Sequence, residues 1–241
     1  MTNDAQSQEL SSVAENYLLC LYTLQEEGLD PNFKNLSSRL RNLPEGERLG
    51  TSTSSVAGML RRMAKEGLVD ITSNKEVILT NTGSANAKDI VRRHRIAERM
   101  VVDLIGVPLH RAHIEAHRLE HAMSSEFLAA AIQKLGNPST CPFGGLIPGH
   151  ELPRNYKSRI SLNTGVENVQ YVVCRVPEED TVLLEYLVDN EILPDNTVSL
   201  VENASYRGII VIQNSVGTSV PLGIDVATRI IVAASTLEGE T

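Results

Sequence analysis

Four histidines and one glutamate gather within twelve consecutive residues of this chain, and they are the side chains best suited to chemistry. On an α-helix, where successive residues lie about 100° apart, they fall within an arc of about 100°; they are His110, His113, His117, Glu120 and His121. The adjoining arc is apolar and predicts a face packed in a core. Imidazoles and a carboxylate beside such a face are typical of a divalent-metal site. The alternative is a solvated polar face, for which Glu and Lys would be the usual residues.

Residues 117–121 also spell H-x-x-E-H, the inverted signature of zinc peptidases. In such an enzyme Glu120 would act as the general base, and two imidazoles would hold Zn(II) with a water molecule. A five-residue motif often arises by chance. The surrounding sequence therefore has to decide between a catalytic site and another kind of metal site.

The composition predicts an ordinary globular protein. The chain has 241 residues, 41% hydrophobic and 22% charged, enough for one large domain or several small ones. No apolar run reaches the length of a membrane span and no basic leader precedes an apolar segment, so we expect a cytoplasmic protein without membrane contact. The cysteines are far apart and lack C-x-x-C spacing, which favours reduced packing residues over a disulfide framework; they are Cys20, Cys141 and Cys174.

The net charge of −8 argues against nucleic-acid binding by the chain as a whole, but the charge is unevenly distributed. Residues 33–65 hold seven basic side chains against two acidic ones, a local net charge of +5. Residues 166–241 hold three basic side chains against twelve acidic ones, a net charge of −9. A basic N-terminal module joined to an acidic C-terminal one is compatible with DNA contact through the first alone.

The N-terminal pattern predicts a winged helix-turn-helix. Apolar residues recur at helical spacing in residues 11–27, and a second short helix fits residues 33–40. Pro and Gly then interrupt the pattern before a third helix in residues 52–67, which has Ser and Thr as N-cap candidates and a final glycine as its stop. Two short β runs around a Ser-Asn turn follow in residues 68–80.

Two more helices and a β-rich segment complete the chain. We expect helices over residues 86–105 and 109–135, the second carrying the histidines. Residues 138–153 are rich in Pro and Gly, which is typical of a linker. Beyond about Asn168, four β runs flank one short helix at residues 180–190. This pattern predicts a small, mostly antiparallel barrel or sandwich.

Four strings of this sequence resemble one known family. Residues 94–99 read H-R-x-x-E-R and residues 113–124 read H-x-E-A-x-R-x-E-H-x-M-S. PFGGLIPG in the linker and AENYLLCLYTLQEEG near the N-terminus complete the match. Together they resemble the diphtheria-toxin-repressor (DtxR/MntR) family of iron- and manganese-dependent transcriptional regulators, whose order of elements agrees with the whole chain.

The resemblance implies a mainly α fold with β structure, in four parts. They are a winged helix-turn-helix DNA-binding domain, a helical metal-binding and dimerisation domain, a Pro/Gly-rich linker and an SH3-like (FeoA-like) small β-barrel. We place these parts at residues 1–83, 84–147, 148–165 and 166–241. The resemblance also implies a homodimer that binds double-stranded operator DNA and is not an enzyme.

The resemblance further implies an ancillary metal site built from His94, Glu98 and His113. His94 and Glu98 are four residues apart on one helix and so share a face. Acidic residues of the last domain would complete the site. Alignment of the string PEEDTVLLE favours Asp180, with Glu179 adjacent, as the ligands from that domain.

The resemblance also implies a primary metal site that would use Glu120 and His121 with positions 117 and 16. Position 117 is His where better-known members have Cys or Glu, and position 16 is Asn where they have Met or Asp. Soft ligands favour Fe(II), whereas an all-oxygen set suits Mn(II). His117 and Asn16 fall between these cases and also raise the affinity for Zn(II). We therefore expect Fe(II) or Mn(II), with Zn(II) as an alternative.

The DNA-reading helix of the family matches this chain from Ser52 onward. Small hydroxyl residues at its N-terminus can meet phosphates or thymine methyl groups in the major groove, and basic residues further along can meet phosphates. Gly58 replaces a common Gln, and residues 43–50 resemble an insertion, so the operator sequence is left open. The DNA-binding candidates are Ser52, Thr53, Ser54, Ser55, Arg61, Arg62 and Lys65.

These expectations combine into one hypothesis about function. The chain would be a metal-dependent DNA-binding repressor that senses intracellular Fe(II) or Mn(II) and controls metal-uptake genes. Two alternatives stay open: a zinc metallopeptidase that uses the motif at residues 117–121, and a metal-independent DNA-binding regulator.

Overall fold

The computed structural model describes residues 10–44, 50–153, 156 and 158–235. The chain divides into two compact units. The first comprises the residues as far as His94 together with His117–Met123, and the second comprises Arg95–Ala116 and the residues from Ser124 onward. The division passes through two helices, between His94 and Arg95 and between Ala116 and His117.

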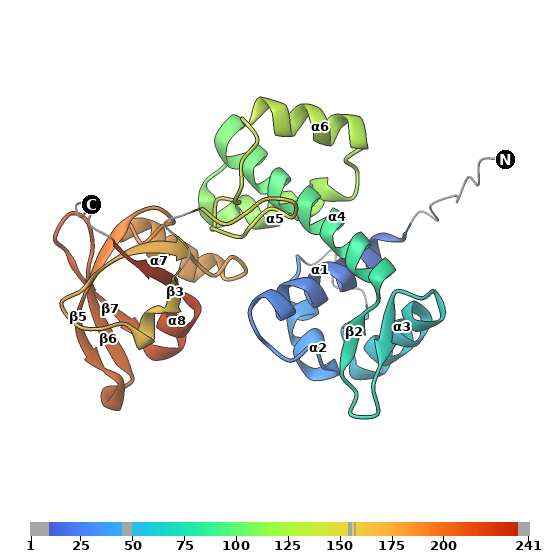
Figure 1. The fold of residues 1–241 in the computed structure, drawn as a ribbon, viewed down its shortest axis with the longest axis horizontal. Helices are drawn as coiled ribbons and strands as arrows, with labels where there is room; N and C mark the ends of the chain where they lie inside the picture. Colours follow the sequence, from blue (N-terminus) through green and yellow to red (C-terminus); the bar gives the residue numbers. More distant parts are fainter. Residues whose placement is uncertain (1–9, 45–49, 154–155, 157, 236–241) are drawn as a thin grey trace. The chain divides into compact units, whose positions relative to one another are not determined.

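The first unit contains three helices and a β-hairpin that share one apolar core with the first part of a fourth, longer helix (Figure 1). Side chains of Ser11, Asn32 and Ser52 cap the three helices by accepting hydrogen bonds from backbone N–H groups of the first turn. This is the predicted winged helix-turn-helix, although most of the expected insertion at residues 43–50 lies outside the described residues. The elements are α1 (Ser12–Glu26), α2 (Phe33–Asn42), α3 (Thr53–Lys65), and the antiparallel strands β1 (Val69–Ile71) and β2 (Val77–Leu79).

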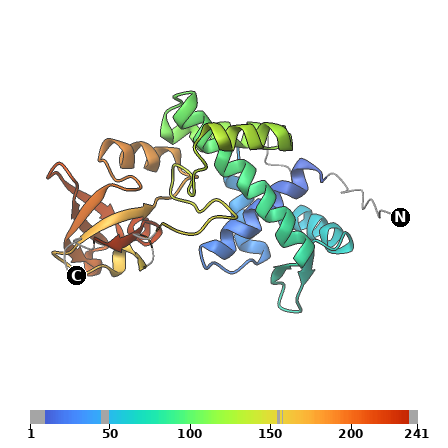
Figure 2. The same ribbon diagram turned by 45° about the horizontal axis from the view of Figure 1, so that its top comes forward.

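A long helix, α4 (Asn81–Arg99), follows the hairpin and passes beside α1 (Figure 2). It begins earlier than predicted because the Thr80 hydroxyl accepts a hydrogen bond from the Gly83 N–H at 3.0 Å. A Cβ atom at Gly83 would lie 1.8 Å from the carbonyl oxygen of Leu68, so only glycine fits where the helix lies this close to the backbone of Leu68. The helix continues as a π-helical segment, Met100–Leu104.

The predicted histidine helix over residues 109–135 is two helices, and the expectation of one was wrong. α5 (Leu109–Glu120) ends at Glu120, and α6 (Ser125–Lys134) begins after Ser124. The Ser124 hydroxyl accepts a hydrogen bond from the Phe127 N–H at 3.2 Å, and such a serine cap starts a new helix although the apolar periodicity continues. His121 therefore lies in the turn between the two helices.

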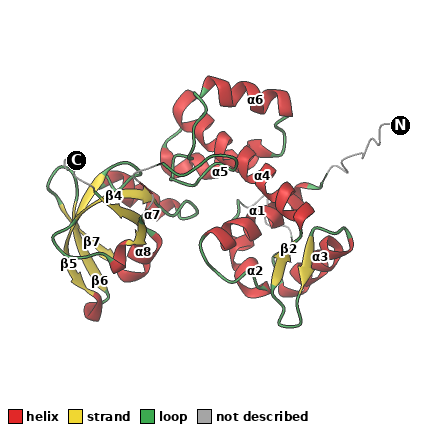
Figure 3. Ribbon diagram, in the orientation of Figure 1, coloured by secondary structure: helices red, strands yellow, loops and turns green. Residues whose placement is uncertain are grey.

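The C-terminal segment forms a six-stranded antiparallel sheet in the order β3-β8-β4-β5-β6-β7, with two short helices beside it (Figure 3). The elements are β3 (Arg159–Ser161), the 3-10 turn Leu162–Thr164, β4 (Gln170–Arg175), α7 (Thr181–Asp189), β5 (Thr197–Ala204), the 3-10 turn Ser205–Arg207, β6 (Ile209–Gln213), β7 (Ser219–Gly223), α8 (Ile224–Arg229) and β8 (Ile231–Ala234).

The sheet contains two strands that the sequence did not predict. β3 lies within the expected linker at residues 148–165 and pairs with β8. β7 contains Pro221, which favours a turn in a sequence pattern but is tolerated on an edge strand such as this one. Among the described residues, no helix combines the length and the apolar character that crossing a membrane requires.

Candidate metal centre

The first group of candidate ligands surrounds Glu120, the last residue of α5. Its side chain is fully buried. The Nδ1 of His117 lies 3.1 Å from Glu120 Oε1, and the Nδ1 of His94, on α4, contacts Oε2. The rings of His94 and His117 lie 4.6 Å apart between centroids. The primary-site candidates at 117 and 120 are thus in direct contact, and His94 joins them.

The carboxyl group of Glu120 is ionised. Burial acts to raise its pKa, but the charges and hydrogen bonds of His117 and His94 act in the opposite direction and outweigh it. The net effect is a pKa well below the usual range. A buried negative charge flanked by imidazole nitrogens is an arrangement that suits a divalent cation.

His121 connects the end of α5 to the first helix of the winged domain. Its Nε2 lies 3.1 Å from Asn16 Oδ1, and its Nδ1 lies 2.6 Å from Glu15 Oε2. Arg93 holds the other oxygen of Glu15 at 2.6 Å and donates to the backbone carbonyl of Glu120 at 3.3 Å. Although burial raises the pKa of Glu15, His121 and Arg93 lower it overall. Glu15 was not among the predicted site residues, despite being the neighbour of Asn16.

The second group of candidate ligands centres on Glu98 of α4 and His113 of α5. The Nδ1 of His113 lies 3.1 Å from Glu98 Oε1, and both side chains are buried. Glu178, on the chain that follows β4, is also buried, and its Oε2 has no hydrogen-bond partner among the described residues. One ligand atom from each of these three residues and one from His94 all lie within 4.8 Å of one another.

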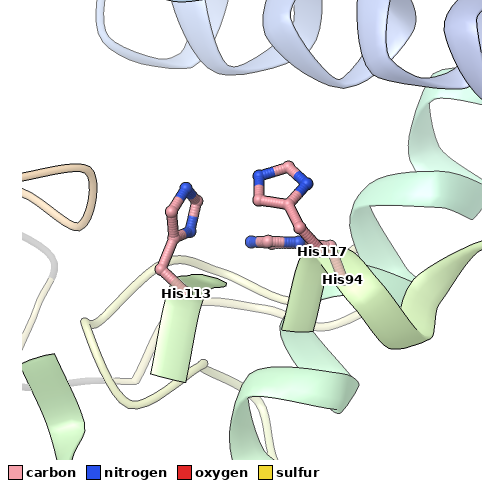
Figure 4. A group of neighbouring side chains, drawn as sticks. All are labelled: His94, His113 and His117. Carbon is pink, nitrogen blue, oxygen red and sulfur yellow. The ribbon is translucent and has the colours of Figure 1, made fainter. Parts of the chain in front are cut away.

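His94 therefore takes part in both groups, although the sequence placed it only in the ancillary site. Ligand atoms of His94, His113 and His117 also lie within 4.8 Å of one another. Figure 4 shows the three imidazole rings side by side, two of them carried by α5 and one by α4.

The donor sets fit a divalent first-row metal. Both groups combine imidazole nitrogens with carboxylate oxygens, a mixture that suits Mn(II), Fe(II) and Zn(II) better than Mg(II) or Ca(II). The buried Oε2 of Glu178 is an independent indication of a metal site. Burying a carboxylate oxygen without a hydrogen bond costs free energy unless a cation is present.

The ligands expected from the last domain, Asp180 and Glu179, do not lie in the second group. Asp180 is the N-cap of α7, where its Oδ1 accepts a hydrogen bond from the Leu183 N–H at 3.0 Å. Glu179 pairs with Arg229 at 3.2 Å. Among the described residues, Glu178 is the carboxylate of this acidic string that lies in the second group. The sequence indicated the string, but which of its residues joins the group depends on the path of the chain after β4.

Cys141 lies beside the second group, although the sequence indicated only a packing role. Burial raises the pKa of its thiol, and the charges of Glu98 and Glu178 raise it further, well above the usual range. The thiol is a hydrogen-bonding neighbour of Glu98.

The predicted DNA-binding residues all lie exposed on α3 or at its N-cap. Ser52 is the N-cap, with its hydroxyl 3.2 Å from the Ser55 N–H. At helical spacing, Ser54, Arg61 and Lys65 share one side of α3, away from the buried side. Arg62 forms a salt bridge with Glu66 at 2.9 Å. The buried side of the helix consists of Val56, Leu60 and Met63.

Two protein-family models match this chain. The model described as iron dependent repressor, metal binding and dimerisation domain matches residues 80–149. The model of the FeoA domain matches residues 160–234. The first covers α4, α5 and α6 together with the candidates His94, Glu98, His113, His117, Glu120 and His121, and the second covers the C-terminal sheet.

Known proteins resemble the chain over most of its length. The iron-dependent repressor IdeR of Mycobacterium leprae (strain TN) is 31% identical over 233 residues, which cover 88% of this chain and 94% of that protein. The diphtheria toxin repressor of Corynebacterium diphtheriae is 38% identical over 141 residues, 58% of each chain. A solved structure of a manganese-dependent transcriptional repressor in complex with manganese matches with a TM-score of 0.79 at 30% identity, covering 92% of this chain and 99% of that one. This chain belongs to the diphtheria-toxin-repressor family of metal-dependent transcriptional repressors.

Proposed function

We propose that this protein senses Fe(II) or Mn(II) and, when metal is bound, represses metal-uptake genes as a homodimer on their operators. Members of the family are repressors and not enzymes. The metallopeptidase alternative is therefore wrong, and the H-x-x-E-H string at residues 117–121 belongs to a regulatory site.

The observation that carries the proposal is the contact of His121 with α1. Asn16 and Glu15 of α1 lie against the two ring nitrogens of His121, next to the buried carboxylate of Glu120. α1 also shares a core with α3, the candidate DNA-reading helix. A ligand set that joins α1 to the end of α5 therefore fixes the orientation of the helix that reads DNA.

Activation follows from linkage between metal binding and conformation. Asn16, His117, Glu120 and His121 would hold one divalent ion, which supplies a positive charge to the buried carboxylate when bound. Because these residues come from both α1 and the end of α5, an ion that binds all of them would raise the population of the arrangement in which they lie together. In a dimer, the same arrangement sets the spacing of the two reading helices along the DNA.

The second group would connect a further part of the chain through a metal ion. His94, Glu98, His113 and Glu178 would hold a second ion, through two imidazoles and two carboxylates. Glu178 is the only member contributed by the C-terminal sheet domain among the described residues. Occupancy of this group would therefore join that domain to α4 and α5.

The domains proposed for these roles keep the boundaries expected from the sequence. Residues 1–83 would bind DNA, residues 84–147 would bind metal and form the dimer, and residues 166–241 would form the SH3-like domain. The stretch 148–165 would connect them, although β3 within it pairs with the C-terminal sheet.

Titration of the metal-free protein with Fe(II), Mn(II) and Zn(II) tests the proposal. Binding to promoter DNA of a metal-uptake gene, followed by fluorescence anisotropy, is expected to strengthen with metal and to be lost on adding a chelator. Promoter DNA of an unrelated gene serves as the control. Equal affinity with and without chelator would support the metal-independent regulator instead.

A further inference from the structure

Residues 139–147 form a tight turn, here named the linker hairpin, between α6 and the C-terminal sheet. Thr140 and Leu146 form an antiparallel bridge. Inside it, the Cys141 N–H donates to the Gly145 carbonyl at 2.8 Å, and the Gly144 N–H donates to the Cys141 carbonyl at 2.9 Å. These hydrogen bonds make the segment an ordered element rather than a loose connection.

One side of the linker hairpin is held by arginines of α4. Arg99 donates from Nε to the Thr140 carbonyl at 2.8 Å. Arg95, which is fully buried, donates to the Leu146 carbonyl. A Cβ atom at Gly145 would lie 2.8 Å from Arg95 Nε, so the absence of a side chain there allows the guanidinium to lie against the backbone.

The other side of the linker hairpin is held by β4. Gly144 has a φ of 88°, and a Cβ atom on it would lie 1.9 Å from the carbonyl oxygen of Cys174. The Val176 N–H donates to the Phe143 carbonyl at 3.0 Å. Phe143 is fully buried in the same apolar cluster as the C-terminal sheet. The hairpin thus continues the hydrogen bonding at the end of β4.

Both segments held by the linker hairpin carry candidate metal ligands. Glu98 lies between Arg95 and Arg99 on α4, and Glu178 lies two residues beyond Val176. The hairpin therefore contacts both of the segments that carry these two carboxylates. Metal–ligand distances tolerate errors of only about 0.2 Å, so a small shift of either segment weakens coordination.

We propose that the linker hairpin, through Gly144 and Arg99, is the positioning element that sets the affinity of the second group for a divalent metal. The inference rests on the proposed function, in which Glu98 and Glu178 bind metal. Neither Gly144 nor Arg99 touches the ion in this account. They act by holding the ligand-bearing segments in place, as outer partners of metal ligands commonly do.

Two substitutions test the inference from opposite sides of the hairpin. Gly144→Ala pushes the turn away from β4, and Arg99→Gln removes the hydrogen bond from Arg99 Nε to the Thr140 carbonyl. Gly149→Ala is the matched glycine control, because Gly149 has a φ of 98° but no neighbour within 4 Å of an added Cβ. Arg207→Gln, which alters an exposed pair with Glu202, is the matched arginine control.

The full-length metal-free protein is titrated with Mn(II) alone and followed by calorimetry, with its melting temperature measured before metal is added. Gly144→Ala and Arg99→Gln are expected to weaken the second binding event about 10- to 100-fold while the first is unchanged. The two controls are expected to bind as the wild type does. A lower melting temperature with both affinities unchanged would assign the hairpin a structural role only and overturn the inference.

Glu178→Gln separates failure of this inference from failure of the proposed site. If Glu178→Gln binds Mn(II) as the wild type does, the ligand assignment itself is wrong. If Glu178→Gln weakens the second event while Gly144→Ala and Arg99→Gln behave like their controls, only the positioning role is wrong. If Gly144→Ala fails to fold, the Mn(II) affinity of Arg99→Gln alone tests the positioning role.

Discussion

Among single residues, Glu120 is the one whose chemistry is most tightly constrained. Its carboxylate is fully buried and contacts the imidazoles of His94 and His117. An ionised carboxylate in such a place is costly without partners, and removing a partner leaves an uncompensated charge. Glutamine keeps the shape and one carbonyl oxygen but loses the charge that attracts a cation.

Glu120→Gln is therefore expected to abolish metal-induced DNA binding while the protein stays folded. Fluorescence anisotropy with operator DNA measures the first property, and thermal unfolding followed by circular dichroism measures the second. Glu126→Gln, in the exposed first turn of α6, is the control and should respond to metal normally.

A Glu120→Gln variant that responds at wild-type metal concentrations would mean that the primary site is misplaced. If this variant unfolds, His121→Ala tests the placement of the primary site instead, because His121 is partly exposed and lies in a turn. Loss of the metal response in a folded His121→Ala protein would support the same assignment.

Position 117 offers a test of metal choice. His117 is buried and contacts Glu120, and its ring centroid lies 4.6 Å from that of His94. Because thiolate favours Fe(II) and carboxylate favours Mn(II), His117→Cys should shift preference toward Fe(II) and His117→Glu toward Mn(II). We expect each shift to be about tenfold, or about 1.4 kcal/mol. Calorimetric titration of the three proteins with each metal measures it, and an identical affinity order in all three would show that His117 is not a ligand.

The grouping of candidate ligands carried by helices could be predicted from the sequence, whereas that of the candidate carried by a loop could not. The spacing of His94 with Glu98, and of His117 with Glu120, is fixed by helix geometry. Glu178 lies in a run of three acidic residues after β4, and its selection depends on where the chain turns into α7. The sequence therefore favoured Asp180, which the structure uses to cap that helix.

At the scale of elements, helices that begin at a capping residue were predicted closely, and short strands were not. α1, α2 and α3 each begin after a Ser or Asn cap close to the predicted position. β3 has three residues, and it is a strand only because β8, 70 residues further along the chain, pairs with it. Such long-range pairing leaves little local signal.

The break between α5 and α6 depends on the Ser124 cap and can be tested. Ser124→Ala removes the hydrogen bond to the Phe127 N–H and is expected to lower the free energy of unfolding by about 1 kcal/mol. Ser125→Ala changes the next residue, whose side chain does not cap, and should cost less. Urea unfolding of both variants measures the difference. Equal stability of the two would indicate that the cap does not determine where α6 begins.

Across the whole molecule, charge separates the part that would bind DNA from the part that would not. The basic stretch at residues 33–65 has a net charge of +5, and residues 166–241 have a net charge of −9. The order of the parts followed from the sequence because each has its own local pattern. The division into two units could not be predicted from the sequence, because residues 117–123 contact the winged domain through side chains that are distant in sequence.

This charge distribution predicts how salt should act on operator binding. Phosphate contacts release counterions, so the logarithm of the binding constant falls linearly with the logarithm of salt concentration. Arg61 and Lys65 share the exposed side of α3, and replacing either by Gln should weaken binding to all sequences and reduce the salt slope by about 1. Lys134→Gln, exposed on α6, is the control and should leave the slope unchanged. An unchanged slope in both α3 variants would contradict the assignment of this helix to the DNA interface, because the acidic remainder of the chain offers phosphates no comparable attraction.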